Sequence, residues 1–146
     1  MRRAIRSAVA VAAALVTAVA GYAAADAQHA DAATPLGPGL VTVTVTIHYS
    51  HFSLSSLHVR RGTTVRFLIL DADPIDHEFI VGDAQVQALH EHGSEAVHPP
   101  VPGEVSVRPG EEGETFYRFD RPGLVLFACH LPGHFAYGMH GWIDVT

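Results

Sequence analysis

The feature that most restricts the fold of this chain is an alternation of apolar and polar residues that begins after Leu40. From Val41 to Tyr49 every second residue is valine, isoleucine or tyrosine, and threonines or His48 stand between them. A period of two is typical of a strand with one buried face, because successive side chains of a strand point to opposite sides of the sheet. The pattern predicts a half-buried strand, with His48 on its solvated face.

Further short segments rich in β-forming residues follow, and turn residues such as Pro109-Gly110 and Arg121-Pro122-Gly123 separate them. Seven or so short strands with turns at regular intervals predict an all-β fold, a β-sandwich. Leu54, Leu57 and either Phe116 or Tyr117 are candidate core residues. The expected strands are 41–49, 52–59, 64–70, 79–81, 104–108, 115–119, 124–128 and 142–145.

The least regular part of this region is a short helical or irregular insert at about 84–102. Residues 84–92 are compatible with a short helix, with Val86 and Leu89 on one face. Its histidines, His90, His92 and His98, leave two interpretations open. They form a second site for Cu(II) or Zn(II), or they belong to a solvated acidic loop. The second is favoured, because residues two apart on a helix point away from each other.

The first 25 residues are typical of an export signal rather than of the folded domain. Three arginines precede an almost unbroken run of alanine and valine, and small residues follow up to Ala25. We expect residues 1–25 to be a signal peptide cleaved after Ala25, with Ala24 or Ala27 as alternatives. An uncleaved membrane anchor is the competing interpretation, and the Sec and twin-arginine routes both remain open. Residues 26–39 are expected to be a linker and 40–146 the folded domain.

The charge of the chain narrows the choice of partners. The sequence has no lysine, and its formal net charge is −6. Removal of the three arginines of the signal, which contains no acid, makes that charge −9. Nucleic acids and anionic membranes are therefore unsuitable partners, because binding them relies on basic side chains. We expect an exported, periplasmic or extracellular monomer that is not inserted in a membrane after cleavage.

The residues with the strongest chemical implication lie near the C-terminus. Cys129 is the single cysteine, His134 follows five positions later and Met139 five after that. Thiolate, imidazole and thioether are soft or borderline ligands that suit copper better than magnesium or calcium. A second histidine from upstream would complete the two-His, one-Cys, weak-Met set of an electron-transfer copper site. His77, where the chain turns back into an apolar run, supplies that imidazole, although its acidic neighbours are also compatible with a solvated bend.

Several segments together resemble the plastocyanin- and azurin-like cupredoxins, over most of the chain from about Val41 to Thr146. The matching segments are Gly62–Phe67, Asp73–Phe79, Tyr117–Phe119, Cys129–His134 and Gly138–Gly141. The insert with its histidines looks more like the periplasmic copper-resistance cupredoxins. One departure is Asp71, since many cupredoxins carry an asparagine a few residues before the first histidine ligand.

The resemblance implies a Greek-key β-sandwich with one copper ion, Cu(I) or Cu(II), at its end. His77, Cys129 and His134 would be the equatorial ligands and Met139 the axial one. His130 is expected to be a surface residue and His140 an exposed neighbour of the copper.

Two functions follow from this resemblance. The first is one-electron transfer between redox partner proteins by a type 1, or blue, copper site. The alternative is copper resistance, in which the protein sequesters copper or hands it to copper-handling proteins. An enzyme is not expected, because the ligands of a second copper set are missing.

Overall fold

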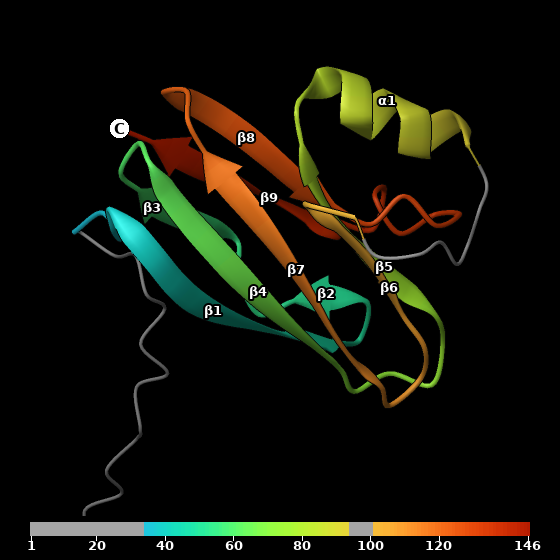
Figure 1. Cartoon of the computed structure of the whole chain (residues 1–146). Coiled ribbons are helices and arrows are strands. Elements are labelled where there is room, and N and C mark those ends of the chain that lie inside the picture. Colours follow the sequence, from blue (N-terminus) through green and yellow to red (C-terminus); the bar gives the residue numbers. More distant parts are fainter. Residues whose placement is uncertain (1–33, 94–100) are drawn as a thin grey trace, which may run out of the picture.

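The computed structural model describes residues 34–93 and 101–146, which form two packed β-sheets and one short helix (Figure 1). The strand orders are β2-β1-β4-β7 in the first sheet and β3-β9-β8-β5-β6 in the second. The first sheet consists of β1 (Gly39–His48), β2 (His51–Phe52), β4 (Thr63–Asp71) and β7 (Glu112–Phe119). The second consists of β3 (Ser56–Val59), β5 (His77–Gly82), β6 (Glu104–Val107), β8 (Gly123–Ala128) and β9 (His140–Val145). The predicted β-sandwich is confirmed.

The connections between strands repeatedly cross from one sheet to the other. β1 lies parallel to β4, with a register that runs from Gly39 opposite Thr63 to Ile47 opposite Asp71. β3 lies parallel to β9, and the other strand pairs are antiparallel. Parallel neighbours cannot be joined by a tight hairpin. The chain accordingly passes through β3 in the second sheet between β1 and β4.

The core lies between the two sheets and is centred on aromatic side chains. The residues of β4 alternate between buried and half-buried, as the period-two pattern predicts. The Phe67 ring of this strand lies 5.0 Å from that of Phe79 in β5. Phe79 in turn packs on Phe52 at 5.3 Å and on Phe127 at 5.4 Å, measured between ring centroids. These contacts join the two sheets close to the predicted copper ligands.

The helix α1 (Ala84–His92) covers the outer face of the second sheet at β5 and β8 (Figure 1). Asp83 caps its first turn by accepting hydrogen bonds from the backbone N–H groups of Gln85 and Val86. Because the core covers one face of β5 and α1 the other, every residue of that strand is buried. This helix matches the range expected from the sequence. In the described part of the chain, no helix has the length and apolar character needed to span a bilayer.

Of the two apolar residues expected on one face of α1, Val86 is half-buried against Gly82, but the buried residue of the helix is a different one. Leu89 is 65% exposed, whereas Gln87 is buried. The Gln87 side-chain amide donates to the carbonyl oxygens of Leu126, Ile80 and Gly82, at 3.0, 3.3 and 3.4 Å. The helix is therefore held by an amide that satisfies sheet carbonyls, which an apolar periodicity cannot reveal.

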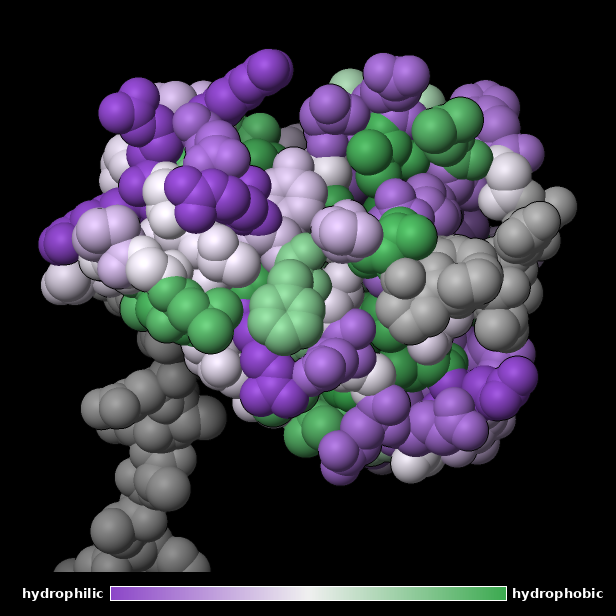
Figure 2. All heavy atoms as spheres, viewed as in Figure 1, coloured by the Kyte–Doolittle hydropathy of each residue, from purple (hydrophilic) through white to green (hydrophobic). Residues whose placement is uncertain are grey.

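Of two smaller expectations, the structure changes one strand and decides which aromatic residue of β7 faces inward. The single strand expected at 52–59 is divided into β2 and β3, with Leu57 buried and Leu54 half-buried against the core. On β7, Tyr117 packs against the core while Phe116 is 41% exposed. Hydrophilic and hydrophobic residues are intermixed over the face of the molecule drawn in Figure 2.

Candidate metal centre

The sheet topology brings the predicted ligands to one end of the sandwich. β5 begins at His77, and β8, its antiparallel neighbour, ends at Ala128, one residue before Cys129. β9 runs antiparallel to β8, so its first residue, His140, lies opposite Ala128. The loop that carries His134 and Met139 therefore leaves and re-enters the second sheet beside the start of β5.

The loop from Cys129 to Met139 is closed by its own backbone. The N–H of Cys129 donates to the carbonyl of Met139 at 3.0 Å, and the N–H of Met139 donates to that of His134 at 3.1 Å. Gly138 has a φ of 94°, a left-handed conformation that glycine adopts without steric cost, and it allows the chain to turn into Met139. Met139 is fully buried and belongs to the same core cluster as Cys129.

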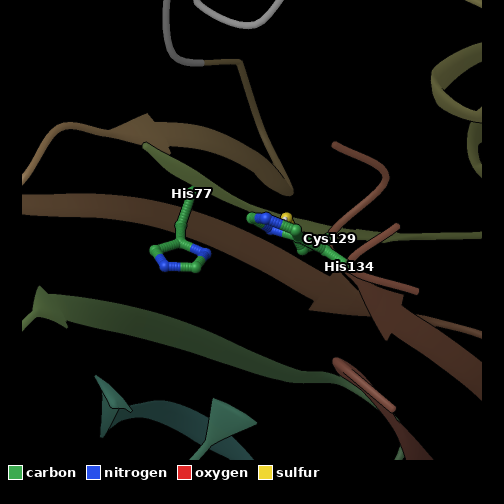
Figure 3. Close-up of side chains that lie close together, drawn as sticks. All are labelled: His77, Cys129 and His134. Atoms are coloured by element: carbon green, nitrogen blue, oxygen red, sulfur yellow. Dashed lines mark hydrogen bonds between the residues drawn. The ribbon is translucent and has the colours of Figure 1, made fainter. Parts of the chain in front are cut away.

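Three of the four predicted ligands converge on one point. The metal-binding atoms of His77, Cys129 and His134 all lie within 4.8 Å of one another. The Cys129 sulfur is 3.2 Å from Nδ1 of His134, and the two imidazole rings are 4.8 Å apart. Figure 3 shows a nitrogen of His77 turned toward Cys129 and His134.

The environment of His77 fits a metal ligand. The side chain is fully buried, and its Nε2 lies 3.2 Å from a carboxylate oxygen of Asp73. Its other nitrogen, Nδ1, is buried without a hydrogen-bond partner. Buried polar atoms normally have a partner, and a metal ion bound between His77, the cysteine and the second histidine would supply one for this nitrogen. Two imidazoles and a sulfur suit copper.

Without a metal ion, Cys129 is a neutral thiol rather than a thiolate. Burial raises the pKa of the Cys129 thiol to about 12, although backbone N–H groups of Glu78 and Leu131 act in the opposite direction. Burial also lowers the pKa of His134, and the nearby His77 contributes to this shift. The resting pair is consequently a thiol beside a neutral imidazole, ready to exchange a proton for a metal ion.

Two acidic residues beside the site are buried, not part of a solvated bend. Asp73 and Glu78 are 7% and 2% exposed, while Asp76 between them is exposed. Glu78 accepts a hydrogen bond from the backbone N–H of His130 at 2.7 Å, which ties β5 to the residue after Cys129. Asp71 accepts from the N–H of Asp73 at 2.9 Å, and burial raises its pKa. In the sequence these residues appear only as three acids near Pro74, a pattern that does not show which carboxylates are buried and which are solvated.

The histidines of the insert do not come together in the described residues. His90 points inward, with Nε2 at 3.1 Å from a carboxylate oxygen of Glu104. His92 is exposed and bonds the carbonyl of Ala88 through Nδ1 at 2.8 Å. His98 lies outside the described residues.

Two further histidines differ from expectation. His130 is half-buried rather than a surface residue, because Nε2 lies 2.6 Å from the Gln87 side-chain oxygen beneath α1. His140 is half-buried as well, since its ring stacks on Phe135 at 4.6 Å. His48 is solvated as predicted, with a 57% exposed side chain.

Known proteins are similar to this chain in fold and in sequence. The structure of auracyanin B is 25% identical and superposes with a TM-score of 0.59, covering 77% of this chain and 93% of that one. Reduced rusticyanin, at 17% identity, shares the fold with a TM-score of 0.55 over 77% of this chain and 83% of its own. The copper-resistant cuproprotein CopI of Rubrivivax gelatinosus is 38% identical over 136 residues, covering 86% of this chain and 82% of that protein. No family model matches the chain.

The sandwich, the histidine–cysteine–histidine group at its end and these neighbours define a cupredoxin, a blue copper protein whose cofactor is a copper ion. Within that class, the chain belongs to the family of CopI copper-resistant cuproproteins.

Proposed function

We propose that this blue copper protein binds one copper ion through His77, Cys129, His134 and Met139 and transfers one electron at a time. Bound copper would supply the Cu(II)/Cu(I) couple. The observation that carries the proposal is the convergence of ligand atoms of His77, Cys129 and His134 within 4.8 Å. The His77 nitrogen that Figure 3 shows turned toward the other two is the one next to Cγ, the orphaned Nδ1. Met139, buried in the loop that holds the other two, suits a weak axial position.

The rigidity of the surroundings favours electron transfer. His77 comes from a strand buried on both faces, and Cys129 follows the strand paired with it. Ligands fixed by a β-scaffold move little when the charge of the metal changes, which favours rapid electron exchange.

Copper loading of the reduced protein tests the ligand set directly. We expect one copper per chain and an intense visible absorption band from the copper–thiolate bond. Cys129→Ser and His77→Ala should lose the band, and His51→Ala, which alters an exposed histidine on β2, should keep it. Wild-type protein that folds and binds copper without the band would refute the proposal.

Copper handling is the second candidate, because the relatives are named copper-resistant cuproproteins. In this function the same site holds copper for sequestration or delivery to a copper-handling protein. Saturating copper stoichiometry and the copper tolerance of a deletion strain separate the two functions. One copper and unchanged tolerance favour the carrier. Additional copper that is lost when His90, His92 and His98 are replaced favours the handler.

The cellular setting is proposed on the same basis. We infer that residues 1–25 direct export and that the segment after residue 25 links the signal to the folded domain, which begins earlier than residue 40, since Leu36 pairs with Val59 and β1 starts at Gly39. We also infer that the mature monomer works in the periplasm or outside the cell as a non-enzymatic protein. Its partners would be redox or copper-handling proteins. Immunodetection of the mature chain in the periplasmic or culture fraction, with its N-terminus sequenced, tests both the export and the cleavage.

A further inference from the structure

We propose that Asp73 is a positioning residue for the copper ligand His77, and that its negative charge lowers the reduction potential of the site. This inference rests on the proposed ligand set. It concerns a carboxylate that does not itself belong to that set but lies behind one of its members, between β4 and β5.

The Asp73 carboxylate is held from several directions. It accepts hydrogen bonds from the backbone N–H groups of Tyr49 at 2.7 Å and Ser50 at 2.6 Å, one on each oxygen. The oxygen that faces Ser50 also lies 3.2 Å from Nε2 of His77. The side chain of Asp73 is only 6% exposed. A buried carboxylate with three donors on two oxygens is a fixed anion in a defined orientation.

The donors come from an unusual turn in the other sheet. Tyr49 and Ser50 connect β1 to β2, and their φ values of 52° and 53° lie in the left-handed region. Residues other than glycine, asparagine and aspartate rarely adopt this conformation, and here two do so in succession. Their N–H groups both point at Asp73, so the anion compensates a strained hairpin. Asp73 thereby links the first sheet to a ligand carried by the second.

The contact with Asp73 determines which nitrogen of His77 is available. A carboxylate accepts and does not donate, so Nε2 must carry the hydrogen and Nδ1 must carry the lone pair. Nδ1 is the orphaned, buried atom, and it is the nitrogen that Figure 3 shows turned toward Cys129 and His134. Asp73 therefore presets the tautomer of His77 that copper requires, before any metal binds.

The same contact affects the bound copper. A carboxylate behind an imidazole makes the ligand more basic, and loss of such a partner typically weakens metal binding about 10- to 100-fold. The added negative charge stabilises Cu(II) more than Cu(I), because Cu(II) carries the larger charge. Removal of the carboxylate charge should thus weaken Cu(II) binding more than Cu(I) binding and raise the reduction potential. Each tenfold difference between the two affinities corresponds to about 59 mV for a one-electron couple.

The test compares Asp73→Asn with Asp76→Asn in the full chain. Asp76 belongs to the same loop and is exposed, so its replacement removes one nearby charge without touching the buried contact. We expect Asp73→Asn to raise the reduction potential by about 59 mV or more and Asp76→Asn to change it far less. Equal potentials in two folded, copper-loaded variants would overturn the inference.

A second measurement uses the unmodified protein without copper and therefore does not depend on how Asp73→Asn folds. Nitrogen-15 NMR of the metal-free wild type should show His77 as the Nε2–H tautomer. An Nδ1–H tautomer would overturn the inference. This result can be obtained even if Asp73→Asn fails to fold. An error in the proposed ligand set can be distinguished from an error about Asp73. If the ligand set is wrong, the visible band survives in Cys129→Ser.

Discussion

Copper binding at this site requires that Cys129 lose its proton, and the copper affinity should therefore rise steeply with pH. The pKa of this buried thiol is about 12. At pH 7 about one sulfur in 10⁵ is a thiolate, and displacement of the proton costs about 7 kcal/mol at 1.36 kcal/mol per pH unit. We expect the apparent association constant for Cu(I) to rise about tenfold for each unit between pH 7 and pH 9. The lowered pKa of His134 keeps this imidazole neutral in that range, so it adds nothing to the slope.

Competition titrations against a Cu(I) chelator of known proton stoichiometry, at pH 7, 8 and 9 and constant ionic strength, measure this slope. Cys129→Ser is the matched control, and its weaker binding should lack the thiol-dependent rise. Calorimetry in buffers of different ionisation enthalpy should give one proton released per copper bound. Equal wild-type affinity at pH 7 and pH 9 would refute the reasoning, because it would require a thiolate in the metal-free protein.

Three further results are expected. Phe79→Ala should lower the free energy of unfolding by about 3–5 kcal/mol in denaturant titrations, because its ring fills the centre of the core, whereas the exposed Phe116→Ala should change it by about 0.5 kcal/mol or less. Met139→Leu conserves side-chain volume, so the metal-free protein should lose less than about 1.5 kcal/mol of unfolding free energy. The copper-loaded variant should keep its visible band, and voltammetry should show a changed reduction potential. The pKa of Asp73 is lowered by the backbone N–H groups of the hairpin and by His77, against the effect of burial. The ionised Asp73 carboxylate therefore stabilises the folded protein above about pH 3.9, and this stabilisation is lost on further acidification. The difference in unfolding free energy between wild type and Asp73→Asn should accordingly shrink between about pH 5 and pH 2.

The sequence was informative wherever structure depends on local spacing. The alternation from Val41 to Tyr49 predicted a strand, because apolar residues at every second position form one buried face. The structure has β1 at Gly39–His48. The spacing of Cys129, His134 and Met139 predicted a loop that gathers ligands, and this loop closes on its own backbone hydrogen bonds. In both cases the partners are close in the chain or repeat at a fixed period.

The buried polar residues could not be predicted, because their partners are distant in the sequence. The N–H groups that hold Asp73 belong to a hairpin 23 and 24 residues earlier, and nothing in the residues around Pro74 indicates that contact. Gln87 reaches Leu126, 39 residues later, so a polar residue became the buried side of α1. A hydrophobicity pattern assigns such residues to solvent, since it takes no account of tertiary hydrogen bonds.

The parallel pairing of β3 with β9 has a consequence for how the chain acquires its structure. Ser56 pairs with Trp142 and Val59 with Val145, so one edge of the second sheet forms only after the last strand has been synthesised. Contacts this distant in sequence slow folding toward the millisecond-to-second range. The proposed copper ligands are divided in the same manner, with His77 at the start of β5 and the other three between β8 and β9. A chain synthesised only as far as β8 therefore carries His77 but none of the other proposed copper ligands, and formation of the proposed copper site must follow synthesis of the segment through Met139.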